Sequence, residues 1–207
     1  MIASTLSTLG AGFADPALGS QAVFRAVLQA LSHPGRSVAV AHGAQTPAAG
    51  HGASAAVLLA LLDGDCTLWL STRLAASDAG PWLRFHTGCT LVTEPGLARF
   101  AWVARGDAMP ALQSLAQGSD SFPDQSATCV LDVALGGGPG AWRLSGPGIR
   151  DTTTLRVDGL PDDFLPQWEA NHAAFPRGID LLLGAPAHIA GLPRTARIAR
   201  AAPTREA

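Results

Sequence analysis

The most informative absence from this 207-residue chain is lysine, since all fourteen of its basic residues are arginine. A Walker A phosphate-binding loop needs a lysine to contact the β- and γ-phosphates of its nucleotide. A pyridoxal-phosphate enzyme needs a lysine to form the Schiff base with its cofactor. The sequence therefore excludes both classes for this chain acting alone.

Charged residues are also scarce. They make up 14% of the chain, and hydrophobic residues make up 47%, whereas an ordinary soluble domain is about 25% charged. Two explanations stay open: a large core or a surface covered by other subunits, and a compositional bias toward Ala, Gly and Arg of the kind that codon usage produces. The net charge of -2 and the lack of a basic cluster predict no nucleic-acid partner.

Long hydrophobic runs are missing as well. The longest unbroken run, Ala55 to Leu62, is far shorter than the roughly 20 residues that cross a bilayer. The first residues show neither a basic start nor a sustained apolar stretch, so we expect no secretory signal and a cytoplasmic location. Residues 1–207 are expected to form a single domain with flexible ends at about 1–12 and 199–207.

No motif for a metal or cofactor is present. The three cysteines, Cys66, Cys89 and Cys129, lie far apart, and there is no CxxC pair. The histidines form neither HExxH nor a paired HxH; they are His33, His42, His51, His86, His172 and His188. The sequence therefore predicts no metal site and no cofactor.

Helical and strand-like patterns alternate along the chain. Helices are expected at 20–32 with Ser20 as the cap, at 53–62, from 78 with Pro81 in the first turn, around 110–117 and at 162–173. Strands are expected at 37–41, 66–71, 90–93, 99–104, 127–135, 142–145, 153–157, 178–183 and 188–192. This interleaving predicts an α/β fold with a mixed central sheet flanked by helices.

The segment WLRFHTGC (82–89) places His86 three residues before Cys89. A histidine beside a cysteine is one arrangement for nucleophilic catalysis. However, the catalytic base usually comes from elsewhere in a fold, and Gly88 is expected to end the helix between the two residues. An independent Cys/His hydrolase or transferase stays an alternative function.

The segment FPRGIDLLL (175–183) contains an aspartate, Asp180, in a strand that otherwise reads as buried. An uncompensated buried carboxylate costs several kcal/mol, so a partner is expected, with Arg84, Arg177 and Arg194 as candidates. Two interpretations stay open. One is a structural polar network, and the other is an arginine-lined pocket in a phosphate or phosphonate sensor.

Two glycine-rich turns, at 136–140 and 145–149, offer a second type of anion site. Consecutive backbone N–H groups of such turns can point at an anion. Pro139 and Pro147 each remove one donor, and neither turn clearly opens a helix. Ordinary tight turns are the favoured interpretation.

Five segments together resemble a known family. They are FRAVLQALSHPGR (24–36), LRFHT (83–87), WRLSGPGI (142–149), FPRGIDLLL (175–183) and LPRTAR (192–197). In their order and approximate spacing they are similar to the PhnH family, whose members are components of the bacterial carbon–phosphorus lyase system for phosphonate degradation. The resemblance extends from about residue 13 to residue 198.

This resemblance implies a fold like the large domain of pyridoxal-phosphate-dependent transferases, without the cofactor lysine. It implies a non-catalytic, dimer-forming subunit that assembles with the G, I and J subunits and transiently with L. That complex makes α-D-ribose 1-methylphosphonate 5-triphosphate from MgATP and alkylphosphonate. No catalytic residues follow from the family. A ligand-binding or interface polar network is expected from Arg84, His86, Thr87, Arg177, Asp180, Arg194 and Thr195.

Overall fold

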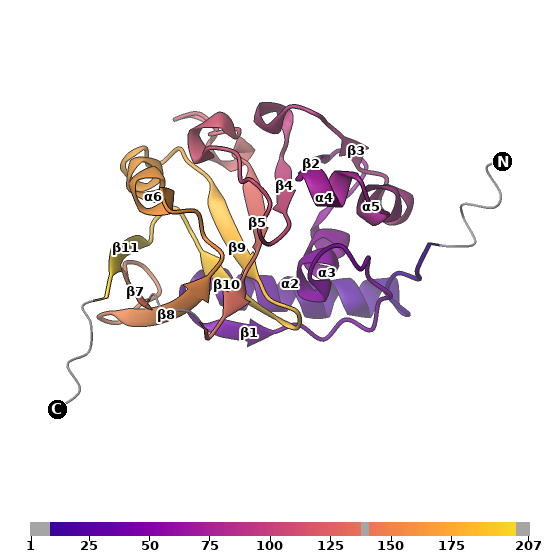
Figure 1. Cartoon of the computed structure of the whole chain (residues 1–207), viewed down its shortest axis with the longest axis horizontal. Coiled ribbons are helices and arrows are strands. Elements are labelled where there is room, and N and C mark those ends of the chain that lie inside the picture. The colour runs from indigo at the N-terminus through magenta and orange to yellow at the C-terminus, as the bar shows by residue number, and fades with distance from the viewer. Residues whose placement is uncertain (1–8, 138–140, 202–207) are drawn as a thin grey trace.

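The structure is a computed structural model that describes residues 9–137 and 141–201. Its centre is a seven-stranded sheet with the order β1-β10-β9-β5-β4-β2-β3 (Figure 1). The five strands from β3 to β9 in that order are parallel, and β10 and β1 are antiparallel to their neighbours. The strands are β1 (Ser37–Ala39), β2 (Thr67–Leu70), β3 (Thr90–Leu91), β4 (Phe100–Val103), β5 (Thr128–Asp132), β9 (Asp180–Gly184) and β10 (His188–Leu192).

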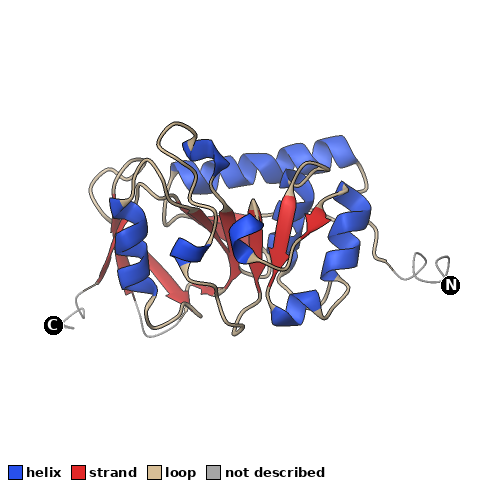
Figure 2. Ribbon diagram, turned by 90° about the horizontal axis from the view of Figure 1, so that it is seen from above, coloured by secondary structure: helices blue, strands red, loops and turns tan. Residues whose placement is uncertain are grey.

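Helices cover both sides of this sheet, as the view from above shows (Figure 2). The helices are α2 (Pro16–Ser32), α3 (Gly52–Leu61), α4 (Thr72–Ala75), α5 (Ala79–Thr87) and α6 (Phe164–Ala173). The predicted α/β fold with a mixed central sheet flanked by helices is thus confirmed.

The central strands are buried on both faces. On one face, Val130 of β5 and Leu182 of β9 belong to a core shared with α2, α3 and α5. On the other face, Leu131 and Leu183 belong to a second core that includes Trp168 of α6. Neighbouring side chains of a strand point to opposite faces, so a strand covered on both sides reads as a continuous apolar run.

A second, antiparallel sheet with the order β11-β7-β8-β6 lies beside the first. Its strands are β6 (Ala134–Leu135), β7 (Ala141–Ser145), β8 (Thr153–Asp158) and β11 (Arg197–Arg200). The buried Val133 connects β5 to β6, so the chain passes directly from one sheet into the other. No strand was predicted at 197–200, because Ile198 is the only large apolar residue there and the alternating pattern is missing.

The first helix begins earlier than predicted. Asp15, and not Ser20, is its N-cap: Oδ1 of Asp15 accepts hydrogen bonds from the backbone N–H groups of Ala17 and Leu18, each at 3.0 Å. Pro16 follows the cap, in the helical position that proline favours. The prediction at Ser20 was wrong because Asp15 and Pro16 together form the stronger start signal.

The prediction of a helix around 110–117 is also wrong. Only a short 3-10 turn, Leu112–Ser114, forms there. Gln117 Nε2 donates hydrogen bonds to the carbonyl oxygens of Leu112 and Leu115, and Ala116 O accepts from the N–H of Ala127. Side-chain and long-range partners therefore replace the hydrogen bonds that a helix would make.

The end of α5 follows the prediction. Gly88 has φ 77° and donates its N–H to Arg84 O, as a left-handed residue after a helix does. Among the helices of residues 9–137 and 141–201, none has the length and apolar character of a membrane span. The flexible ends expected at 1–12 and 199–207 and the turn expected at 136–140 lie partly outside the described residues.

Candidate functional site

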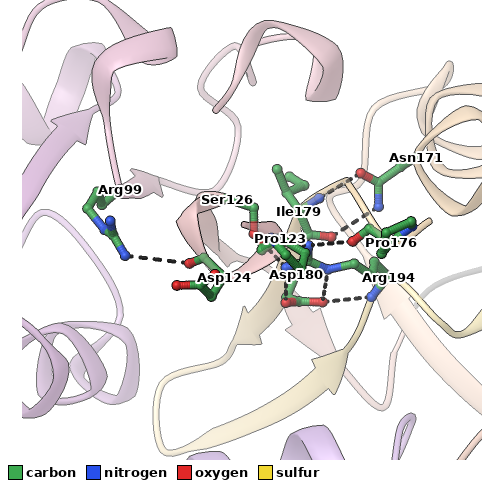
Figure 3. Close-up of polar contacts among 9 residues, drawn as sticks. All are labelled: Arg99, Pro123, Asp124, Ser126, Asn171, Pro176, Ile179, Asp180 and Arg194. Atoms are coloured by element: carbon green, nitrogen blue, oxygen red, sulfur yellow. Dashed lines mark hydrogen bonds and ion pairs between the residues drawn. The ribbon is translucent and has the colours of Figure 1, made fainter. Parts of the chain in front are cut away.

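The pair Asp180 and Arg194 is the centre of the largest polar network around the predicted site residues (Figure 3). Asp180 is the first residue of β9, and Arg194 follows the end of β10, so the antiparallel pairing of these strands brings the two together. Arg194 Nη2 lies 2.7 Å from Asp180 Oδ2, and Nε lies 3.2 Å from Oδ1. The backbone N–H of Arg194 also donates to Oδ1, at 2.8 Å.

The remaining donors of the Arg194 guanidinium are used within the protein. Nη1 donates to the carbonyl oxygens of Pro123 at 3.1 Å and Pro176 at 3.2 Å. Nη2 also donates to Ser126 Oγ at 2.5 Å. A guanidinium has five N–H groups, and all five have partners here. Arg194 therefore has no free donor for a ligand, and the network joins three loops to the end of the sheet.

Two neighbours extend this network. Arg197 Nε donates to His172 Nε2 at 3.2 Å, so Nδ1 of His172 carries the proton and donates to Arg194 O at 2.9 Å. The side-chain amide of Asn171 bonds to both the N–H and the carbonyl of Ile179, next to Asp180. In the sequence His172 was only one of six histidines and Asn171 was not singled out, because an amide or imidazole on a helix carries no motif.

Arg177 and Thr195 lie near the pair but outside it. Arg177 Nε is 3.3 Å from Asp120 Oδ1, and both side chains are mostly exposed. Thr195 lines a shallow pocket of about 310 Å³ together with Phe175 and Arg194. The exposed ion pair between Arg177 and Asp120 contributes little to stability.

The residues predicted from the LRFHT segment lie on α5, at the opposite end of the molecule from α6 (Figure 1). His86 Nε2 donates to Gly10 O at 3.0 Å, and Trp82 Nε1 donates to the same oxygen at 2.8 Å. Thr87 Oγ1 donates to Leu83 O at 2.8 Å. The two bonds to Gly10 attach the segment before α2 to α5, whereas the Thr87 bond lies within α5.

Arg84 is exposed on α5, and among the described residues it has no ion pair. The seven predicted residues thus form two separate groups, one on α5 and one around Asp180. Of the three candidate partners for Asp180, the structure selects Arg194.

The Cys/His hypothesis depends on Cys89, which is 1% exposed. Burial raises the pKa of its thiol, and a thiol with a raised pKa is a weak nucleophile. His86 is engaged with Gly10 O, as described above. Burial also raises the pKa of Cys129 to about 12. The geometry therefore favours packing roles for these thiols.

A second buried carboxylate, Asp132, was not singled out from the sequence. Oδ1 accepts a hydrogen bond from Trp102 Nε1 and Oδ2 accepts one from the N–H of His51, each at 3.0 Å. Asp132 is 1% exposed, and burial raises the pKa of its carboxyl, while the two hydrogen bonds act in the opposite direction. The available signal was the same as for Asp180, an acidic residue in an apolar strand.

Comparisons with known proteins add evidence of another kind. A family model described as "Bacterial phosphonate metabolism protein (PhnH)" matches residues 11–199. The alpha-D-ribose 1-methylphosphonate 5-triphosphate synthase subunit PhnH of Rhizobium meliloti (strain 1021) is 41% identical over 190 residues, which cover 91% of this chain and 94% of that protein. The putative C-P lyase subunit protein HtxG of Stutzerimonas stutzeri is 34% identical over 178 residues, which cover 86% and 85% respectively.

Proposed function

Because this chain belongs to the PhnH family of bacterial phosphonate metabolism proteins, we propose that it is a subunit of a carbon–phosphorus lyase complex. In this role it takes part in making α-D-ribose 1-methylphosphonate 5-triphosphate from MgATP and alkylphosphonate. The observation that carries the proposal is the 41% identity to a subunit of that synthase over nearly the whole of both chains. The family predicted from five short segments is confirmed.

The proposed role is non-catalytic. Two observations support it: the Arg194 guanidinium has all five donors engaged within the chain, and Cys89 is buried with a raised pKa. The groups that looked most reactive in the sequence therefore serve packing and loop positioning. Bond-making is then the task of other subunits.

The proposed partners are a second copy of the chain and the G, I, J and, transiently, L subunits. The exposed apolar side chains of α2 support an assembled state: Leu18 is 66% exposed, Phe24 46% and Leu28 52%. The buried face of α2 is formed by other residues, Val23, Ala26, Val27 and Ala30. Apolar groups gathered on a surface helix are typical of contact sites.

Three further points belong to the proposal. The chain is one domain, it works in the cytoplasm, and its central sheet is related to that of the large domain of pyridoxal-phosphate-dependent transferases. The five adjacent parallel strands support the relationship in fold, and the absence of lysine fits a relative that has no cofactor. An experimental structure compared with those transferases would test it.

Co-expression of the tagged chain with the other core subunits tests the assembly. We expect co-elution in a single size-exclusion peak, because a lasting interface would cover the exposed apolar groups. We expect the double variant Phe24→Ser with Leu28→Ser to lose most of its partners. Phe122→Ser, which removes a side chain that is 56% exposed elsewhere, is the matched control and should co-elute like the natural chain.

Two outcomes would contradict this proposal. If the natural chain elutes as a monomer while the other subunits assemble without it, the subunit assignment is wrong. Equal loss of partners in the α2 double variant and in Phe122→Ser would show that α2 is not part of the interface.

A further inference from the structure

Two glycine-containing turns that are distant in the sequence meet at the C-terminal end of α2. One is the segment His33 to Arg36, directly after the helix, and the other follows β7, from Gly146 to Arg150. The first turn and residues 146–149 of the second belong to the segments that resemble the PhnH family, and neither turn contributes to the Asp180 network. Between them lies a pocket of about 430 Å³.

The contact between the turns requires glycine. A Cβ at Gly148 would overlap the carbonyl oxygen of Ser32, and Gly148 has φ 81°. A Cβ at Gly35, which also has φ 81°, would lie 2.9 Å from Thr153 Cγ2. Side chains other than glycine are disfavoured at positive φ. The turns are therefore fixed against each other, and the pocket has a defined shape.

The charge in this pocket is opposite to that of the whole chain. Arg36 and Arg150 line it together with a single carboxylate, Asp151, while the chain carries a net charge of -2. In residues 9–137 and 141–201, neither arginine side chain has a hydrogen bond or ion pair, in contrast to Arg194. The C-terminal end of α2 adds about half a negative charge, which leaves the pocket positive.

Backbone N–H groups without an acceptor belong to residues of the pocket lining. Along the described chain, the N–H groups of Arg150, Asp151 and Thr152 have no backbone or side-chain acceptor. These three residues are consecutive and line the pocket. Successive N–H groups in a turn form a cradle for anions. Thr152 and Thr153 add hydroxyl groups to the lining, and hydroxyls donate readily to phosphoryl oxygens.

We propose that this turn pocket, lined by Arg36, Arg150 and residues 151–153, binds a phosphoryl-type oxyanion. Guanidinium groups form charge-assisted, often bidentate hydrogen bonds with such oxygens. The chemistry is shared by inorganic phosphate, an alkylphosphonate and the polyphosphate of a nucleotide. The pocket volume of about 430 Å³ accommodates a chain of phosphoryl groups. This ligand site does not depend on the subunit assignment, since the isolated full chain carries every group involved.

Isothermal titration of the isolated full chain tests the site. Inorganic phosphate, methylphosphonate and ATP without metal are titrated separately, each up to about 10 mM, in excess of a millimolar dissociation constant. We expect saturable binding of at least one of the three, and their relative affinities identify the source. Arg36→Ala and Arg150→Ala should each weaken binding about tenfold or more, because each removes a charge-assisted contact.

Arg99→Ala is the matched control, since it also removes one exposed arginine, directly before β4 and outside the pocket lining. Its affinity should stay within about twofold of the natural chain, the size of a screened long-range effect. A flat titration with all three ligands overturns the proposal. So does binding that survives both Arg36→Ala and Arg150→Ala, or binding that is lost in Arg99→Ala alone.

Discussion

Replacing Arg194 by alanine should lower the free energy of unfolding by about 3–5 kcal/mol, the range found when one partner of a buried ion pair is removed. The side chain of Arg194 is 12% exposed and that of Asp180 is 27% exposed. Without the guanidinium, the Asp180 carboxylate loses its ion-pair partner, and the carbonyls of Pro123 and Pro176 lose their donors. For a chain of this size, thermal unfolding should shift downward by roughly 6–20 °C.

The lysine variant separates charge from geometry. Arg194→Lys keeps the positive charge but offers three donors from one nitrogen, in place of five in a planar fork. It cannot reach Asp180, Ser126 and both carbonyls at once. We therefore expect Arg194→Lys to lower the free energy of unfolding by about 2 kcal/mol, the size of a hydrogen bond to a charged group. Its stability would then lie between those of Arg194→Ala and the natural chain.

Arg177→Ala is the control for the Arg194 variants. Arg177 is 50% exposed and its partner Asp120 is 79% exposed, so the change should stay within about 0.5 kcal/mol. Denaturant unfolding of the four proteins gives the comparison. Full stability of Arg194→Ala would show that the guanidinium is free for a ligand, contrary to the hydrogen bonding described above.

Asp132→Asn should lower the free energy of unfolding by about 1–3 kcal/mol, the cost of leaving a buried polar group unsatisfied. Both carboxylate oxygens of Asp132 accept hydrogen bonds, from Trp102 Nε1 and from the N–H of His51. An asparagine has one acceptor oxygen and an NH2 group that can only donate, whereas both oxygens of a carboxyl keep acceptor capacity even when it is protonated. One of the two N–H groups would then face another donor in a site that excludes water.

The loss of unfolding free energy caused by Asp132→Asn should depend on pH in a defined direction. Burial raises the pKa of the Asp132 carboxyl above its ordinary value of 3.8. Between 3.8 and the raised pKa, the folded state keeps a proton that the unfolded state has lost, so stability falls as the pH rises through this window. Asparagine has no such proton. The stability difference between the natural chain and Asp132→Asn should therefore narrow with rising pH in that window.

Denaturant unfolding across this pH range measures both effects, with Asp162→Asn as the control. Asp162 is exposed, and its replacement should change the free energy of unfolding by no more than about 0.5 kcal/mol. A difference that widens with rising pH would mean that hydrogen bonding outweighs burial at Asp132. Equal stability of Asp132→Asn and the natural chain would mean that the two hydrogen bonds do not contribute.

The sequence predicted the main elements because their signals are local. The position of Asp180 in a strand that reads as buried predicted a partner for its carboxylate, and the pairing of β9 with β10 explains why Arg194 is that partner. Arg84 and Arg177 are also arginines in segments that resemble the family. Only the three-dimensional fold distinguishes them from Arg194. Residue type alone gives the need for a partner, whereas topology gives its identity.

The errors come from contacts that sequence periodicity does not contain. Gln117 forms hydrogen bonds that replace a predicted helix, and Asp15 begins α2 ahead of the expected cap. The turn at 145–149 read as an ordinary turn because Pro147 removes a donor. The structure places it against the turn after α2, where Arg36 and Arg150 line the same pocket.

The decisive measurement is ³¹P NMR of MgATP and methylphosphonate incubated with the purified chain, with the assembled subunits, and with the other subunits lacking this chain. If the chain is a non-catalytic subunit, the full assembly forms the ribose phosphonate triphosphate, whereas the chain alone forms none. Removal of the chain should reduce or abolish product. Product formed by the chain alone, and abolished by a point substitution in it, would contradict the proposed role.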